Sequence, residues 1–308
     1  MDLTIFAGKG GVGKSTSAVA YALATAEKGD DTLIIDFDGG HSVARTLDVI
    51  TEEKNSNSMV CSGIQKISLG VVDRIKYSNI AEYKLRGEKT ADYLEQFTGA
   101  QGLVPYHDMA TEFFGLLTDI NTVSSFASLM GLLEDAERKK VKKVVIDVEP
   151  TAGLERLLTS TKQMTRSLTN LQNRGIVIQT VIRVWPDIKA CLDGEYITHA
   201  DKYLKTLEKT AERLKRADYN LVCVPEEGPV GQIEQVEELI KNYGGEIKAY
   251  VINNIRGEPG EGKQIRRVKI IAKGRPIIRV ERDRRIQDWR LEERRELLKN
   301  IGRKIIAA

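Results

Sequence analysis

The sequence GKGGVGKS at residues 8–15 constrains this chain more than any other feature. It follows a short apolar run at 2–7 and precedes small and apolar residues at helical spacing over 15–28. Glycines let backbone N–H groups face a phosphate without interference from a Cβ atom, and the start of the following helix adds partial positive charge. A glycine-rich loop between a strand and a helix therefore predicts a phosphate-binding loop, or P-loop.

The segments around this loop predict the fold class. The helix is expected to end at Gly29, and a second apolar run follows at 32–36. Strand–helix–strand units of this kind have parallel strands joined by a right-handed crossover. We therefore expect an α/β fold of the P-loop NTPase type, with a mostly parallel, doubly wound sheet and ligand chemistry at the carboxyl ends of its strands. Further strands are expected at 67–72, 143–147, 220–224, 249–253 and 276–280.

Two long stretches interrupt the strand pattern. Residues 75–140 and 153–215 carry apolar residues mostly at helical spacing. Within the second stretch, 176–184 is ambiguous because it is rich in β-branched residues. We expect residues 1–308 to form a single P-loop domain, with these two insertions making a helical subdomain.

Individual residues of the loop have predictable roles toward a nucleoside triphosphate. Lys14 would reach the β- and γ-phosphates, the Ser15 hydroxyl would bind Mg²⁺, and Thr16 should contact the α-phosphate. Asp147 ends the apolar strand at 143–147, which is typical of a Walker B aspartate that holds a magnesium-bound water. We expect ATP and Mg²⁺ as cofactors and hydrolysis of ATP to ADP and phosphate. Backbone N–H groups toward the phosphates would come from Gly10, Gly11, Val12 and Gly13.

Lys9 distinguishes this loop from an ordinary P-loop. With KGGVGKST at 9–16, the chain resembles the deviant-Walker ATPases, which include partition and septum-site ATPases, the nitrogenase iron protein and the arsenite-pump ATPases. In that group a signature lysine crosses a dimer interface to the partner's nucleotide. The resemblance therefore implies that Lys9 and Lys14 are both catalytic and that two copies form a homodimer across their nucleotides.

The resemblance extends to the segments after two strands. Residues 36–42 look like the switch I segment, which implies that Asp38 orients the attacking water and that Asp36 supports the magnesium shell through water. An ordinary turn aspartate is the alternative at position 38. Residues 150–158 resemble the family's switch II segment, although the family's histidine is missing there.

Two later segments resemble the family's base-binding blocks. The segment near Pro225 would pack on the adenine, and Asn253 would read the adenine edge. An asparagine at the end of a strand is also a common turn former, so that alternative stays open.

The long insertions favour the arsenite-pump and tail-anchor-targeting branch of the group. The three cysteines form no CxxC, so the zinc clamp of the targeting ATPases and a clustered arsenite triad are both missing. Three functions of the dimer remain open. The dimer could shield a hydrophobic tail-anchored client, energise a transport partner as an anion-pump subunit does, or bind DNA or a membrane surface as partition ATPases do.

Composition and charge indicate the compartment of the protein and the partners that suit its basic region. Apolar residues make up 41% and charged residues 30%, and no run approaches the roughly 18 apolar residues that would span a bilayer. We expect a cytoplasmic protein that is not integral to a membrane. From Arg256 onward, 17 Lys/Arg face 8 Asp/Glu, a net charge of +9. This basic region suits nucleic acid or an anionic membrane, and the alternative is a solvated face laced with Glu–Arg pairs.

Overall fold

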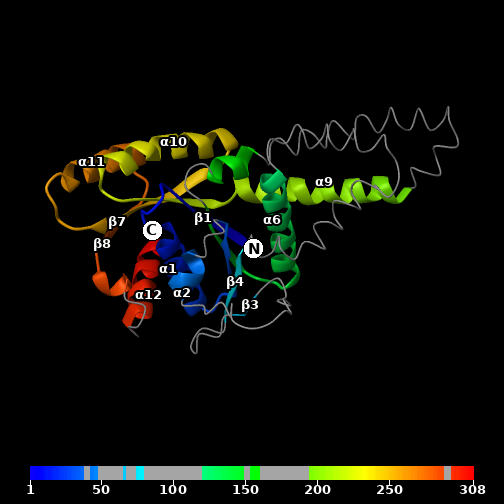
Figure 1. Cartoon of the computed structure of the whole chain (residues 1–308), viewed down its shortest axis with the longest axis horizontal. Helices are drawn as coiled ribbons and strands as arrows, with labels where there is room; N and C mark the ends of the chain where they lie inside the picture. The colour runs from blue at the N-terminus through cyan, green and yellow to red at the C-terminus, as the bar shows by residue number, and fades with distance from the viewer. Residues whose placement is uncertain are drawn as a thin grey trace. The chain divides into compact units, whose positions relative to one another are not determined.

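The computed structural model describes residues 1–37, 42–47, 65–66, 74–79, 120–148, 153–159, 194–287 and 293–308 (Figure 1). The chain divides into two compact units. The first unit comprises 1–83, 134–155 and 214–308 and contains the sheet and the P-loop. The second comprises 84–133 and 156–213, and its described residues are helical.

The first unit is built on an eight-stranded sheet with the order β3-β4-β2-β5-β1-β6-β7-β8. Neighbouring strands run parallel throughout, except that β3 runs antiparallel to β4. The expected α/β fold with a mostly parallel sheet is therefore confirmed. The strands are β1 (Asp2–Ala7), β2 (Thr32–Asp36), β3 (Gln65–Lys66), β4 (Ile75–Asn79), β5 (Lys143–Asp147), β6 (Asp218–Cys223), β7 (Glu246–Ile255) and β8 (Ile277–Glu281).

Helices cover both faces of this sheet, which is why the central strands are continuous apolar runs rather than alternating ones. Phe6, Ile34 and Val145 belong to one buried cluster with α1 (Lys14–Glu27), α2 (Ser42–Leu47) and α12 (Glu293–Ile306). Helices α10 (Glu227–Tyr243) and α11 (Glu261–Ala272) lie on the other side of the strands (Figure 1). The fold is therefore doubly wound, as the sequence predicts.

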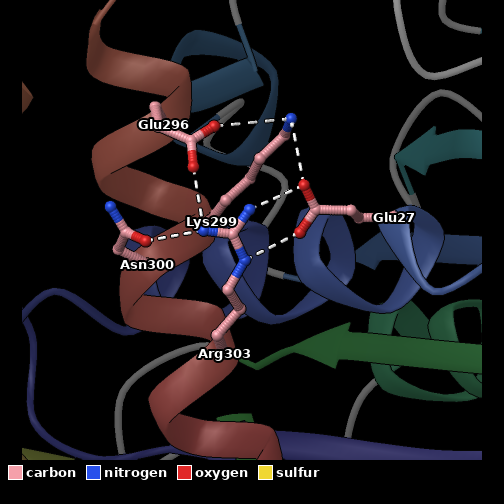
Figure 2. A network of polar contacts seen from close by, with 5 residues as sticks. All are labelled: Glu27, Glu296, Lys299, Asn300 and Arg303. Carbon is pink, nitrogen blue, oxygen red and sulfur yellow. Dashed lines mark hydrogen bonds and ion pairs between the residues drawn. The ribbon is translucent and has the colours of Figure 1, made fainter.

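Helix α12 packs closely on the P-loop helix α1. A Cβ atom added at Gly302 would lie 1.9 Å from the carbonyl oxygen of Ala20, so only glycine permits this approach. Figure 2 shows the polar contacts that flank it. Arg303 donates from Nε and Nη2 to the two carboxylate oxygens of Glu27 at 2.8 and 2.7 Å, and from Nη1 to Glu296 at 2.8 Å. Glu–Arg pairs of the kind considered for the basic region thus occur on this helix.

Helix α1 ends as expected, since Gly29 follows its C-cap with a φ of 92°. The start of the stretch 75–140, expected to be helical, is instead the strand β4. Its five residues show no strong apolar pattern, and their strand conformation comes from pairing along β2, which buries Ile75 and Tyr77 completely. The expected strand at 67–72 and the ambiguous segment 176–184 lie outside the described residues.

Each described helix of the two insertions contains a boundary between the two units, so its residues belong partly to one unit and partly to the other. They are α6 (Ile120–Arg138) and α9 (Gly194–Lys215), and residues 153–159 are also helical. Phe126, Leu129, Met130 and Leu133 belong to the apolar residues at helical spacing in the stretch 75–140, and all four are buried in α6. Among the described residues, no helix combines the length and apolarity needed to cross a bilayer.

Candidate functional site

The loop between β1 and α1 turns through left-handed backbone conformations. Gly8, Gly11 and Gly13 have φ angles of 151°, 78° and 90°, which side chains with a Cβ atom rarely adopt. A Cβ atom at Gly8 would lie 2.1 Å from the carbonyl oxygen of Val222 in β6. The loop therefore starts in close contact with the neighbouring strand, and its glycines are needed for this path.

Asn253 on β7 holds the far side of the loop. Its side-chain Nδ2 donates a hydrogen bond to the carbonyl oxygen of Val12 at 2.9 Å. A Cβ atom at Gly13 would lie 2.1 Å from the same Nδ2 atom. The amide of Asn253 thus lies directly against the last turn of the loop before α1 begins.

The two lysines of the loop differ in their surroundings. Lys14 is buried, and its Nζ donates to the carbonyl oxygen of Lys9 at 3.1 Å, so the ammonium lies back over the loop. Lys9 is exposed. A Cβ atom at Gly228 would lie 3.5 Å from its Nζ, which places that ammonium beside the first turn of α10.

The start of α1 offers donors to an anion. Its N-cap residue is Gly13, which has no side chain to accept from the N–H groups of Ser15 and Thr16. Both residues are only partly buried. Unpaired N–H groups and the helix dipole make such a terminus suited to phosphate.

The hydroxyl of Ser15 reaches beyond the loop. Its Oγ donates to the Oγ of Ser42 at 3.0 Å, and Ser42 is the first residue of α2. The next residue, Val43, donates its backbone N–H to Oδ2 of Asp36 at 3.3 Å. The start of α2 is therefore tied both to the loop and to the end of β2.

Two aspartates end the strands that lie next to the loop. Asp36 and Asp147 are register partners on β2 and β5, and Asp147 is also in register with Phe6 on β1. Both carboxylates are buried, with 0% and 1% exposure. Since the three strands are parallel neighbours, both acids lie at the carboxyl edge from which the loop starts.

The donor set fits a nucleoside triphosphate with a hard divalent cation. Main-chain N–H groups, the Lys14 ammonium and the Thr16 hydroxyl suit phosphate oxygens. The Ser15 hydroxyl together with Asp36 and Asp147 offers the oxygen ligands that Mg²⁺ prefers, directly or through water. The arrangement can therefore hold a phosphoryl group and neutralise charge that develops on it.

The remaining predicted residues are placed as follows. Pro225 is buried two residues after the end of β6, and Asn253 is half-buried on β7, the next strand of the sheet. Asp38 and the switch II residues 150–152 lie outside the described residues. Gly10 and Gly11 are exposed at the tip of the loop, with Val12 buried beneath it.

Two contacts were not predicted from the sequence. The hydroxyl pair between Ser15 and Ser42 joins residues far apart in the chain, and the hydrogen bond from Asn253 to Val12 joins β7 to the loop. Ser42 lies within the segment 36–42 that resembles switch I, so that resemblance could have indicated a position near the P-loop. For Asn253 the only signal was its place near the end of a strand.

Comparison with known proteins agrees with this geometry. The sequence model of the anion-transporting ATPase family matches residues 1–273. A protein of Aquifex aeolicus named as an arsenical pump-driving ATPase is 22% identical over 284 residues, which cover 89% of this chain and 86% of the relative. The ATPase GET3 of Malassezia globosa is 23% identical, covering 82% and 72%. An ATPase ASNA1 homolog of Cryptosporidium parvum is 23% identical over 76% of this chain, which spans 60% of that relative.

Proposed function

The chain belongs to the anion-transporting ATPase family and is an ATPase, and from this premise we propose that it binds ATP with Mg²⁺ at residues 8–16 and works as a nucleotide-switched homodimer. The observation that carries the proposal is the loop itself. Lys14 is buried and bonds back to a glycine-rich turn at the start of a helix, and two buried aspartates end strands at the same edge of the sheet.

Each side chain has a part in the proposed site. Lys14 and the N–H groups of residues 10–16 would bind the β- and γ-phosphates. Ser15 would hold Mg²⁺, with Asp36 and Asp147 binding through water, and the cation would supply charge neutralisation at the transferred phosphoryl group. Asp38 as the residue that positions the attacking water rests on the resemblance of segment 36–42 alone. Pro225 and Asn253 are proposed to face the adenine.

The homodimer is proposed from the contrast between the two lysines. The Lys9 side chain is exposed and forms no ion pair with another described residue, whereas Lys14 is buried in its own loop. A lysine presented outward beside a phosphate site is suited to a nucleotide held by a second copy. This supports the role that the deviant-Walker resemblance implies for Lys9.

The switch is proposed from the start of α2. The Ser15 hydroxyl donates to Ser42, the first residue of this helix, and the Asp36 carboxylate accepts from the N–H group of Val43, the second residue. A cation that recruits the Ser15 hydroxyl would therefore compete with the hydroxyl of Ser42. A change of the bound nucleotide would thus change the contacts of α2 and of the segment before it.

A hydrophobic tail-anchored client is proposed on the resemblance to the arsenite-pump and tail-anchor-targeting branch. We place client contact in the second unit, residues 84–133 and 156–213. The apolar residues described in its α6 helix, such as Leu129 and Met130, are buried, so they are not part of an exposed client surface.

Turnover of ATP by Lys14→Ala tests the site. We expect the variant to lose about 100-fold or more in kcat, because a charge-stabilising donor is removed from the transition state. Lys28→Ala, at the exposed C-terminal end of the same helix, is the matched control and should keep full activity. EDTA should abolish turnover and excess Mg²⁺ restore it. Undiminished turnover by Lys14→Ala would remove the proposed phosphate site.

The dimer is tested separately. Light scattering with a non-hydrolysable ATP analogue and Mg²⁺ should give twice the monomer mass for the natural chain, and Lys9→Ala should remain a monomer. A natural chain that stays monomeric while turning over ATP would overturn the dimer and leave the ATP site intact.

A further inference from the structure

Helix α11 has an exposed face that is basic along its whole length. Its buried side packs inward through Val268, Ile271 and Ala272. At about 3.6 residues per turn, five residues share about a third of the circumference on the opposite side. All five are exposed, and we call them the basic face of α11: Lys263, Arg266, Lys269, Ile270 and Lys273, the last being the C-cap residue.

The charges of this face are not neutralised within the described part of the chain. None of its four cations forms an ion pair with another described residue. Two acids of α10 pair with cations outside the basic face. Glu234 binds Arg267 at 3.4 Å, and Glu237 binds Arg275 at 3.0 Å and also Lys241 of α10 itself. The basic face therefore presents uncompensated positive charge to a partner.

The first-turn acid of α11 is also engaged elsewhere. The carboxylate of Glu261 accepts backbone N–H groups from Arg256, Gly257 and Glu258, at 2.8 to 3.3 Å. It closes the loop before the helix and does not face the cations of the later turns.

An apolar side chain lies among these cations. Ile270 is 76% exposed, the most exposed large apolar side chain in the described residues. It lies one helical turn from Arg266 and next to Lys269. Arg279 adds a further exposed cation on the edge strand β8. Because Ile278 and Val280 belong to the cluster under α1 and α12, Arg279 lies on the sheet face that carries α11.

We propose that the basic face of α11 binds the anionic surface of a phospholipid bilayer, with Ile270 inserted between the headgroups. Lysine and arginine beside one apolar side chain match a surface whose outer layer is negative and whose interior is apolar. Nucleic acid offers the same negative charge, but it gives Ile270 no apolar layer to enter. Helix α11 also has no aromatic side chain on which a base could stack.

Vesicle sedimentation of the full chain tests the proposal. Vesicles of phosphatidylserine and phosphatidylcholine should bind the natural chain at low salt, and vesicles of phosphatidylcholine alone should not. The triple variant Lys263→Gln, Arg266→Gln, Lys269→Gln should bind about 100-fold more weakly, at about fivefold for each charge near the surface. Ile270→Asn should bind about tenfold more weakly. ATP turnover of both variants should be unchanged, which shows that they are folded.

A matched triple variant and a DNA-binding measurement distinguish binding through net charge, or to nucleic acid, from membrane binding through the basic face of α11. Lys28→Gln, Lys139→Gln, Lys205→Gln removes three exposed lysines elsewhere and should bind the anionic vesicles like the natural chain. Equal losses for both triple variants would overturn the proposal, because net charge would then be sufficient. Tighter binding to duplex DNA than to the vesicles, with no effect of Ile270→Asn, would overturn it in favour of a nucleic-acid surface.

Discussion

The side-chain amide of Asn253 donates to the backbone carbonyl of Val12 at 2.9 Å and thereby ties strand β7 to the phosphate-binding loop. The two residues come from opposite ends of the sheet-forming part of the chain. The loop is held on one side by β6, through the close approach of Gly8 to Val222, and on the other by Asn253. Its shape is therefore fixed by two strands that follow it by about two hundred residues.

Replacement of Asn253 separates a supporting role from adenine recognition. Asn253→Ala removes one hydrogen bond worth about 1 kcal/mol, so we expect nucleotide affinity to fall about fivefold. Asn253→Asp should bind more weakly still, because a carboxylate would face the Val12 carbonyl. Calorimetric titration with ATP and with GTP distinguishes the roles. Equal losses for both nucleotides indicate support of the loop, and a loss confined to ATP indicates contact with adenine.

The glycines of the loop differ in what a side chain would meet. Gly13→Ala would place its Cβ atom 2.1 Å from Nδ2 of Asn253 at a φ of 90°, whereas Gly11→Ala at a φ of 78° would meet nothing within 4 Å. We expect Gly11→Ala to cost only the backbone strain, about 1–2 kcal/mol in the free energy of unfolding, and Gly13→Ala to cost more. Urea unfolding of both variants measures this.

The double variant Gly13→Ala, Asn253→Ala checks the cause. It should recover part of the stability lost by Gly13→Ala, because the colliding amide is gone. Additive losses for the two substitutions would contradict a collision between them.

The sequence predicts the centre of the fold better than its edges. Strands β1, β2 and β5 are apolar runs ended by glycine or aspartate, and this local pattern alone fixes their positions. Strand β4 has no such pattern, because Lys76, Ser78 and Asn79 interrupt it, and only its pairing with β2 makes it a strand. The packing of α12 on α1 depends on one glycine and is equally invisible in local periodicity.

The candidate site is likewise predictable only where a local sequence pattern determines it. Residues 8–16 are predictable because a phosphate-binding loop needs contiguous glycines, a lysine and hydroxyls. The hydrogen bond between Ser15 and Ser42 and that between Asn253 and Val12 arise where the sheet brings distant segments together. No spacing in the sequence encodes either distance. The role of Asp38, which lies outside the described residues, stays a prediction.

Glu237 should make stability depend on pH. Burial disfavours its charged form, but hydrogen bonds from Lys241, Tyr250 and Arg275 outweigh this and hold the pKa of Glu237 below its ordinary value. Burial, together with this carboxylate, raises the pKa of Tyr250 to about 12, so the phenol remains a donor. A carboxyl whose folded-state pKa is lowered contributes stability above its unfolded pKa, about 4.3, and loses it as pH falls through the folded value.

Glu237→Gln should therefore lower the free energy of unfolding by about 1–3 kcal/mol at pH 7. The difference from the natural chain should be the same at pH 5 and shrink below about pH 4.3. Urea unfolding at pH 7, 5 and 3.5 measures it. A difference that persists undiminished at pH 3.5 would show that shape, rather than charge, carries the effect.

Gly302 should control the attachment of α12, a helix that lies beyond residues 1–273 matched by the family model. In Gly302→Ala the new Cβ atom would lie 1.9 Å from the Ala20 carbonyl oxygen and 2.7 Å from the Cβ of Ala24. Neither atom belongs to a flexible side chain, so α12 must move away from α1. We expect a loss of about 1–3 kcal/mol in the free energy of unfolding.

The matched control for this variant is Gly262→Ala in α11. A Cβ atom there would meet nothing within 4 Å, and alanine favours a helix over glycine by up to about 1 kcal/mol. The two substitutions are chemically identical and both lie in helices, so the urea midpoint should fall for Gly302→Ala and hold or rise for Gly262→Ala. Because α1 carries Lys14 and Ser15 at its other end, displacement of α12 should also weaken nucleotide binding. Unchanged stability of Gly302→Ala would mean that α12 is not packed against α1 in solution.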